Sequence, residues 1–312
     1  MRTNKKIIII LFLGVILSAF SQSKWTTYRI SNSFSPKNDI SAIRFDKNEN
    51  MWVATWNGLY KLVDNKWQTV GPENIYIQSF YIDNQDVKWV GILGARLYMS
   101  EDGMLWNPVK EVSLASSINA ITADKTGTIW VGDWLQGVFS YKNKTWTNYK
   151  SDQLKLGDNS VTSISCDSKN NMWFGSYHGL TGYNPLSGSK IYNTENSKLP
   201  VNDVYSLYSD SKDNLWIGTI NGLAEFNGKD WSIFKRETSD IPSGLIFCIT
   251  EDQRGYIWIG TDKGVSFFNG KIWTTFNVEN SQLIDNRVQT ITAHNSKVFI
   301  GTSKGISVVE LP

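Results

Sequence analysis

One short motif recurs seven times along the chain. It begins with an apolar residue and an anchoring aromatic, as in MWVATWNGLY (51–60) and IWIGTDKGVS (257–266). The anchors are Trp52, Trp89, Trp130, Trp173, Trp216, Trp258 and Phe299, 37 to 43 residues apart. An aspartate stands six residues before each of the first six anchors, at Asp46, Asp83, Asp124, Asp167, Asp210 and Asp252, and Ala293 takes that place in the seventh copy. A fixed period of this length indicates a repeat architecture in which each copy is one supersecondary unit.

Each unit predicts four short β-strands. In the fifth copy, VYSLY is followed by the turn DSKD, the strand LWIGT, an Asn-Gly turn, the strand GLAEF and the strand WSIF. Runs rich in β-branched and aromatic residues, separated by Asx and Gly turns, are hairpin signals. Four antiparallel strands repeated about every 40 residues are typical of propeller blades. We therefore predict an all-β fold, a seven-bladed β-propeller of four-stranded antiparallel blades.

The ends of the chain predict how the ring closes. The fourth-strand motif first occurs at Trp25, before the first anchor, and it is missing after the seventh unit. Fifteen residues separate Trp25 from Ile40, and the same number separate Trp273 from Val288. The N-terminal strand should therefore complete the last blade. Closure of this kind removes the open edges on which sheets aggregate.

The first 21 residues have the features of a cleavable secretory signal. A basic start (Arg2, Lys5 and Lys6) precedes an apolar run over 7–17 and the small residues Ala19 and Ser21. The apolar run is shorter than the roughly 20 residues that a membrane-spanning helix needs. We therefore expect a signal peptide at 1–21 and a propeller domain at 22–312, exported to the periplasm or the extracellular space, with no membrane span in the mature chain.

Charge and motifs exclude several function classes. The chain has 31 Lys and Arg against 29 Asp and Glu, and without residues 1–21 the balance is 28 against 29. Such a near-neutral protein lacks the clustered positive charge that attracts nucleic acid. The sequence has no H-E-x-x-H, no G-x-S-x-G and no phosphate loop, and its two histidines, His178 and His294, fall in turns on opposite faces. We expect no catalytic residue, metal or cofactor, and no disulfide between Cys166 and Cys248.

Two tryptophans exceed what the repeat requires. The chain has 14, of which the anchor and fourth-strand positions take six each. The other two, Trp56 and Trp134, share one repeat position, in the turn between the second and third strands. They either seal the mouth of the central channel or form an aromatic platform with Tyr177. On the platform reading, the candidate ligand-binding residues of this face are Trp56, Asn57, Arg96, Asp133, Trp134, Tyr177, His178, Asn202 and Arg287.

The repeat also resembles a known family. DSKDNLWIGTINGL (210–223) and DQRGYIWIGTDKGV (252–265) are similar to the two-component regulator propeller repeat, and the likeness extends over essentially all of the chain after residue 21. In that family the repeats form the extracytoplasmic sensor of membrane receptors, often with glycan fragments as signals. The immunoglobulin-like linker, membrane span and kinase of those receptors are not seen in this sequence. The resemblance therefore implies a sensor portion that does not signal through its own chain.

These patterns predict a non-enzymatic, exported binding module. Flat aromatic side chains flanked by Asn, Asp and Arg suit a glycan or a similar hydroxyl-rich small ligand. They also suit an envelope protein, since Trp, Tyr and Arg are common hot-spot residues at protein interfaces. A hydrolase or lyase is the third hypothesis, because streptogramin lyases share the blade number.

Overall fold

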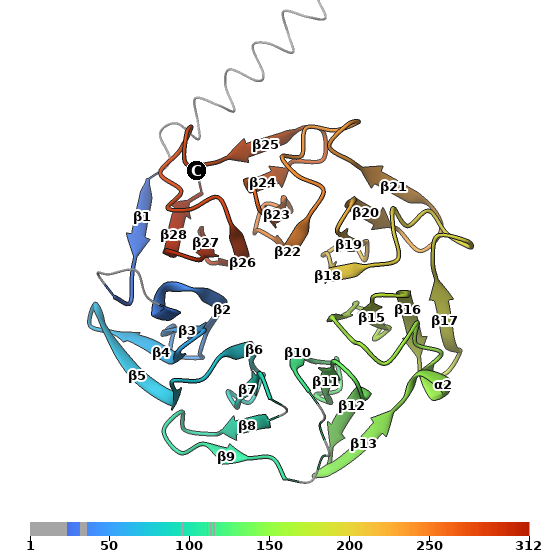
Figure 1. Ribbon diagram of the computed structural model, residues 1–312, viewed down its shortest axis with the longest axis horizontal. Coiled ribbons are helices and arrows are strands. Elements are labelled where there is room, and N and C mark those ends of the chain that lie inside the picture. The colour runs from blue at the N-terminus through green and yellow to red at the C-terminus, as the bar shows by residue number, and fades with distance from the viewer. Residues whose placement is uncertain are drawn as a thin grey trace, which may run out of the picture.

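The computed structural model describes residues 24–31, 36–94, 96–110, 112, 114 and 116–311. The predicted signal peptide at 1–21 lies outside the described residues. Seven four-stranded antiparallel sheets are arranged around a central axis (Figure 1). The predicted fold class is therefore confirmed.

The blades follow one another in chain order, and each begins with its innermost strand. Blade 1 contains β2 (Ile40–Phe45), β3 (Met51–Thr55), β4 (Gly58–Val63) and β5 (Lys66–Glu73); blade 2 contains β6 (Ile77–Ile82), β7 (Lys88–Ile92), β8 (Arg96–Ser100) and β9 (Asn107–Pro108). Blade 3 contains β10 (Ile118–Ala123), β11 (Ile129–Asp133), β12 (Gly137–Lys142) and β13 (Thr145–Tyr149); blade 4 contains β14 (Ser163–Cys166), β15 (Met172–Ser176), β16 (Gly179–Asn184) and β17 (Gly188–Tyr192). Blade 5 contains β18 (Val204–Ser209), β19 (Leu215–Thr219), β20 (Gly222–Phe226) and β21 (Trp231–Phe234); blade 6 contains β22 (Ile246–Glu251), β23 (Ile257–Thr261), β24 (Gly264–Phe268) and β25 (Trp273–Phe276). Blade 7 contains β26 (Val288–His294), β27 (Lys297–Thr302), β28 (Gly305–Glu310) and β1 (Trp25–Tyr28); two short helices, η1 (Pro36–Asn38) and α2 (Ser151–Leu154), lie in connections between blades.

The ring closes through the N-terminal strand, as the sequence predicts. Strand β1 pairs antiparallel with β28, with Trp25 opposite Val309 and Tyr28 opposite Ile306. The strand order of blade 7 is therefore β1-β28-β27-β26, and the first strand of the chain forms the outer edge of the last blade.

Six of the seven second strands carry a glycine that permits close packing between blades, and β3 of blade 1 has Ala54 at this position. A Cβ added at Gly91 would lie 2.6 Å from side-chain carbons of Ile118 on the innermost strand of the next blade. At Gly260 the corresponding distance to Val288 is also 2.6 Å. Because real Cβ atoms do not approach so closely, any larger residue would push neighbouring blades apart.

The repeated aspartate bonds to the anchor tryptophan as well as to its own turn. Asp46 Oδ1 accepts the backbone N–H groups of Asn48 and Asn50, and Asp46 Oδ2 accepts the indole N–H of Trp52 at 2.8 Å. All six Asp–Trp pairs make the indole bond, at 2.8 to 3.4 Å. The sequence predicted the turn role of these carboxylates, and the indole bond is the additional finding.

The hydrophobic core lies between neighbouring blades. The anchor Trp52 is buried and packs with Phe80 of the next blade, and Trp258 is fully buried with Val288 and Ile300. Both cysteines are free, and burial raises the pKa of the Cys248 thiol. Cys248 therefore packs as a small, unreactive side chain beside Gly260.

Candidate functional site

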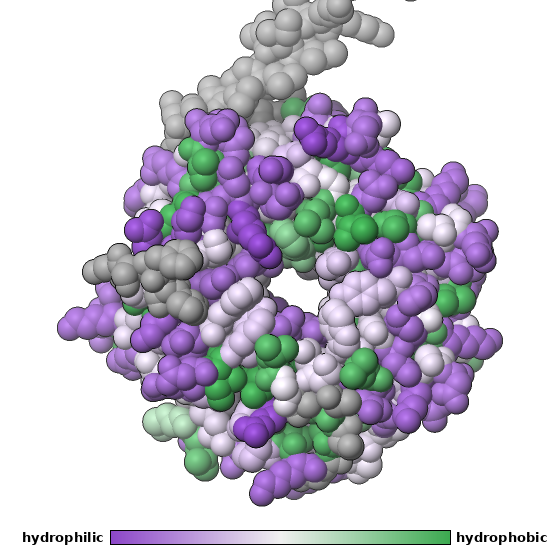
Figure 2. All heavy atoms as spheres, in the orientation of Figure 1, coloured by the Kyte–Doolittle hydropathy of each residue, from purple (hydrophilic) through white to green (hydrophobic). Residues whose placement is uncertain are grey.

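The turns that carry the surplus tryptophans adjoin the loops that enter the innermost strands. The backbone N–H of Trp56 donates to the carbonyl of Asp39, and the N–H of Trp134 donates to the carbonyl of Ser117. Both tryptophans therefore lie near the mouth of the central channel. Figure 2 shows that the ring is open at its centre, with hydrophobic residues close to the rim.

The surplus tryptophans belong to two separate aromatic groups. Trp56 packs against Tyr76 of the next blade, with ring centroids 4.5 Å apart. Trp134 packs against Tyr177 at 5.2 Å, and Tyr177 packs against Tyr205 at 5.8 Å. The two tryptophans are 41% and 38% exposed, so each is partly packed on a neighbour and partly open to solvent.

A cavity of about 310 Å³ lies next to Trp56. It is lined by Ser41, Trp56, Tyr76, Gln78, Asn119, Phe247, Arg287 and Gln289. Five of these residues, Ser41, Gln78, Asn119, Phe247 and Gln289, take the second position of the innermost strands β2, β6, β10, β22 and β26. The cavity therefore extends over several blades at the channel mouth.

Several buried oxygen atoms around this cavity lack a hydrogen-bond partner within the described part of the chain. They are Ser41 Oγ, Asn119 Oδ1 and Gln289 Oε1 in the lining, and Asp39 Oδ1 beside it. A buried acceptor without a donor costs about 1–3 kcal/mol. The cavity is therefore suited to molecules that bring hydroxyl or amine donors.

Arg287 and Asp39 are two charged groups that lie at the mouth, and the charge of Asp285 also acts on Asp39. The Arg287 guanidinium lies over the Phe247 ring, 5.6 Å from its centroid. Burial raises the pKa of Asp39, although a hydrogen bond from Gln289 and the charge of Arg287 oppose that shift. Burial and the nearby Asp39 carboxylate also raise the pKa of Tyr76 to about 12, so the Tyr76 hydroxyl keeps its proton at neutral pH.

The structure brings two of the predicted site residues, Trp56 and Arg287, to this cavity. Asp133 is buried and caps its own turn by accepting the backbone N–H groups of Leu135 and Gln136. Asn202 accepts the backbone N–H of Thr194 in the loop before blade 5.

The remaining predicted residues are not among those that line this cavity. His178 Nδ1 is 2.5 Å from Asp158 Oδ2, and the His178 side chain is exposed. The carbonyl of Asn57 accepts the N–H of Asn74, and Arg96 is exposed at the start of β8. Trp134 and Tyr177 form the second aromatic group described above.

Sequence reasoning missed most of the polar lining. Gln78, Asn119 and Gln289 all follow the first apolar residue of an innermost strand. An alignment of the seven units shows this position as Ser41, Gln78, Asn119, Thr162, Tyr205, Phe247 and Gln289. The signal was therefore present in the repeat, although a search for exposed turn residues does not find it.

Within the described ranges, no three His, Cys, Asp or Glu side chains lie close enough together to hold a metal ion. In the same part of the chain, no helix has both the length and the apolar character that crossing a bilayer requires.

The family model for the two component regulator propeller matches the chain in four places, at 35–57, 155–178, 198–221 and 240–263. These four segments of the chain match two-component regulator propeller repeats. Each match ends in a turn between the second and third strands, at Asn57, His178, Asn221 or Lys263. The matched segments of this propeller therefore include the turns that surround the channel mouth.

Solved structures share the fold of this propeller. The extracellular domain of a protein assigned as a hybrid two component system of B. thetaiotaomicron is 22% identical, with a TM-score of 0.80, and the match covers 93% of this chain and 41% of that chain. Virginiamycin B lyase from Staphylococcus aureus is 13% identical, with a TM-score of 0.78 and coverage of 93% and 100%. No curated protein sequence matches the chain significantly. At these identities the structural matches show the fold alone, and the propeller spans about two fifths of the B. thetaiotaomicron domain.

Proposed function

We propose that this two-component regulator propeller is an exported, non-enzymatic, sensor-like module that binds a saccharide or a similar hydroxyl-rich small ligand at the channel mouth. The observation that carries the proposal is the cavity beside Trp56. It combines an aromatic wall, an arginine and buried acceptors that lack donors.

Each part of the cavity matches one feature of a sugar. The flat Trp56 and Tyr76 rings offer an apolar surface to the C–H face of a pyranose. Ser41 Oγ, Asn119 Oδ1 and Gln289 Oε1 can accept hydroxyl protons. The Arg287 guanidinium supplies donors for ring hydroxyls or for a sugar carboxylate. A volume of about 310 Å³ is at the small end of the usual range for ligand sites, so a mono- or disaccharide is the expected size.

The sensor role and the exported location rest on different support. The solved domain of the B. thetaiotaomicron two component system is extracellular and has this fold. The start of the sequence has the pattern of a secretory signal. In this proposal, ligand occupancy at the mouth is the signal, and a separate envelope protein transmits it.

An envelope protein partner is the alternative for the same face. It is favoured by the second aromatic group, where Trp134 and Tyr177 adjoin Leu135, a leucine that is 54% exposed. Exposed Trp and Tyr side chains are frequent hot spots. This partner would depend on Trp134, whereas a saccharide in the cavity would depend on Trp56.

A lyase is favoured by one observation, the exposed His178 paired with Asp158. A histidine held by a carboxylate is a common general base. If the protein is a lyase, it should convert a bound ligand to product. His178→Ala should then abolish this turnover while the affinity for the ligand stays unchanged.

A saccharide screen tests the proposal. Thermal shift of the purified protein is measured against neutral and acidic mono- and disaccharides, and each hit is followed by calorimetry and by product analysis. We expect at least one saccharide to raise the Tm and to remain chemically intact. A panel in which no sugar binds contradicts the proposal, and breakdown of the bound sugar supports the lyase instead.

A further inference from the structure

A second cavity lies at a repeat position where most blades carry an aromatic residue. The third residue after the fourth-strand anchor position is aromatic in five blades: Tyr28, Tyr149, Tyr192, Phe234 and Phe276. In blade 5, the Phe234 ring lies 5.8 Å from the anchor Trp216 of its own blade and 5.5 Å from Trp273 of the next. The aromatic ring at this position therefore fills a slot between the outer parts of two blades.

Blade 2 has a valine in this slot. The N–H of Val109 donates to the carbonyl of Leu97, and Leu97 corresponds to Leu223, the strand partner of Phe234. The backbone of Val109 is thus in the equivalent place, but its side chain is much smaller than an aromatic ring. Blade 1 also has a valine, Val70, but there Trp106 packs in the cluster and donates its indole N–H to the Val70 carbonyl.

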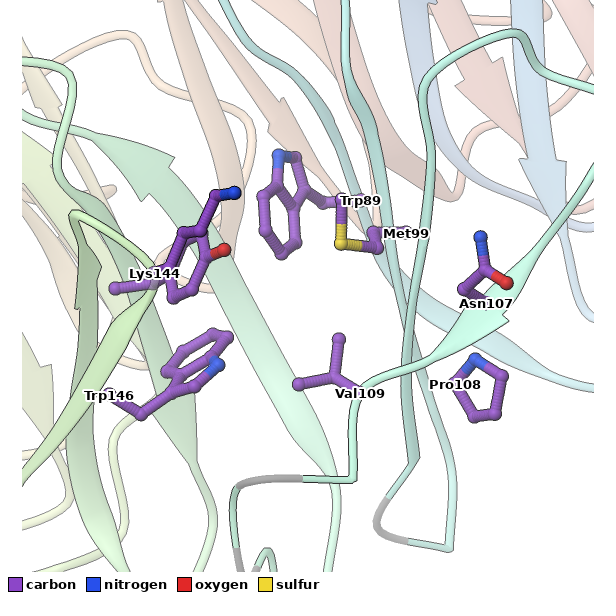
Figure 3. Close-up of a pocket in the computed structure, with 8 residues that line it drawn as sticks. Trp89, Met99, Asn107, Pro108, Val109, Lys144 and Trp146 are labelled. Carbon is purple, nitrogen blue, oxygen red and sulfur yellow. The ribbon is translucent and has the colours of Figure 1, made fainter.

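In the described part of the chain, a cavity of about 290 Å³ lies at this slot, between blades 2 and 3. Figure 3 shows its lining residues around an open centre: Trp89, Met99, Asn107, Pro108, Val109, Tyr141, Lys144 and Trp146. Strand β9 is only two residues long on this side, and its Asn107 and Pro108 are exposed. The slot is therefore accessible from the outer surface of the ring.

The aromatic side chains that line the slot pack against one another in the arrangements that aromatic pairs prefer. Trp146 lies 6.4 Å from Trp89 in an edge-to-face arrangement and 4.8 Å from Tyr141. Met99 contributes a thioether, which makes favourable contacts with ring edges. A further planar ring between Val109 and Trp146 would replace the side chain that five other blades supply.

The charge at the slot is positive. Among the described residues that line it, Lys144 is the one that carries a charge. A larger cavity of about 490 Å³ shares Trp89, Met99, Tyr141 and Lys144 with it. That cavity adds Lys125 and Lys142, and it also contains Asp83 and Glu101. The Asp83 carboxylate is bonded to the Trp89 indole and to backbone N–H groups of its turn, so it is not available to a ligand cation.

We propose that the slot between blades 2 and 3 is a second binding site, separate from the channel mouth, for a small planar aromatic acid. The ring of this ligand occupies the space above Val109, between Met99 and Trp146. Its carboxylate faces the ammonium group of Lys144. This inference does not depend on the saccharide site, because the two cavities share no residue.

Methyl NMR of the full protein tests this site with indole-3-acetate as the probe and neutral indole as its control. In protein labelled at methionine methyl groups, Met99 reports on the slot, and Met104, which is 81% exposed, reports on nonspecific binding. We expect indole-3-acetate to shift the Met99 signal saturably and to leave Met104 unmoved. Lys144→Gln should weaken indole-3-acetate about three- to five-fold, as expected for an exposed ion pair, and should not weaken indole.

Val109→Tyr is the complementary variant, because it restores the ring of the other blades. It should abolish binding of both probes without lowering the Tm. Three results would overturn the proposal: no saturable Met99 shift, undiminished binding in Val109→Tyr, or a Met99 response to tyrosine-containing peptides but not to indole-3-acetate. If Val109→Tyr does not fold, Lys144→Gln provides the test. Equal affinity of Lys144→Gln and wild type for indole-3-acetate would then count against the site.

Discussion

The carboxylate of Asp252 accepts the indole N–H of Trp258 at 2.8 Å, and both side chains are buried. The same bond occurs in the first six blades, and the seventh has Ala293 and Phe299 at the two positions. Neither of those residues can form the bond. The carboxylate and the indole are thus lost together, which is expected if either one alone would leave a buried polar group without its partner.

The Asp–Trp bond should be measurable in blade 5 by a double-mutant cycle. Asp210→Ala removes the turn acceptor and the indole partner, and should lower the free energy of unfolding by about 2–4 kcal/mol. Trp216→Phe should cost about 1–3 kcal/mol, because it leaves Asp210 Oδ2 with fewer donors. Denaturant unfolding of the double variant should show a coupling of about 0.5–3 kcal/mol. Strictly additive effects would mean that the bond adds nothing to stability.

Asp46 predicts a specific response to acid. Burial opposes ionisation, but hydrogen bonds from Trp52, Asn50 and Lys61 outweigh it and lower the pKa of Asp46 from 3.8 to about 2. A carboxyl whose pKa is lower in the folded state stabilises the protein above its unfolded pKa, and this contribution is lost as the pH falls. Wild type should therefore lose more stability than Asp46→Asn between about pH 3.8 and pH 2. Parallel Tm profiles for the two proteins over this range would contradict the prediction.

The closing strand should be essential for the stability of the ring. Trp25 packs edge-to-face on Phe276 at 5.5 Å and belongs to the core between blades 6 and 7. Trp25→Ala should lower the free energy of unfolding by about 2–4 kcal/mol, because Trp25 is half-buried. Thr26→Ala, at an exposed position of the same strand, is the matched control and should stay within about 0.5 kcal/mol. Equal melting temperatures for the two variants would show that packing of the Trp25 side chain does not stabilise the closed ring.

The surplus tryptophans should contribute less to stability than the anchors do. Trp56 is 41% exposed and Trp134 is 38% exposed, whereas Trp216 is 3% exposed. Trp216→Ala should cost about 3–5 kcal/mol, and each surplus tryptophan about 1–2 kcal/mol through its contact with Tyr76 or Tyr177. If Trp56→Ala destabilises the protein as much as Trp216→Ala, then Trp56 seals the channel mouth and is not held open for a ligand.

The seven-bladed ring could be predicted from the sequence because its motif recurs at a regular spacing. Seven copies of one motif determine the blade number, and the early position of Trp25 determines the closure. The Asp–Trp bond was less visible, because a spacing of six residues across a turn has meaning only when the strand register is known. In the observed register Arg44 lies opposite Trp52, and the indole N–H of Trp52 donates to the Asp46 carboxylate.

The site was harder to predict because it depends on contacts between different blades. Trp56 and Trp134 share a repeat position, yet Trp56 packs on Tyr76 and Trp134 packs on Tyr177, and a common platform stays a prediction. Asp133 looks like a ligand-binding carboxylate in the sequence, and in the structure its Oδ1 accepts N–H groups of its own turn while its Oδ2 accepts the N–H of Ser116. The repeat alone shows that an aromatic residue is missing at both Val70 and Val109, and the structure is needed to show that Trp106 packs at Val70 while a cavity lies beside Val109.

Calorimetric titration of a saccharide identified by the screen tests the central claim most directly. Trp56→Ala and Arg287→Gln change the cavity, and Trp134→Ala is the matched control at the same repeat position in another blade. Trp56→Ala should weaken binding by about 1–3 kcal/mol, Arg287→Gln should weaken acidic sugars most, and Trp134→Ala should bind like wild type. Wild-type affinity in Trp56→Ala, together with loss of binding in Trp134→Ala, would contradict the account and move the site to the second aromatic group.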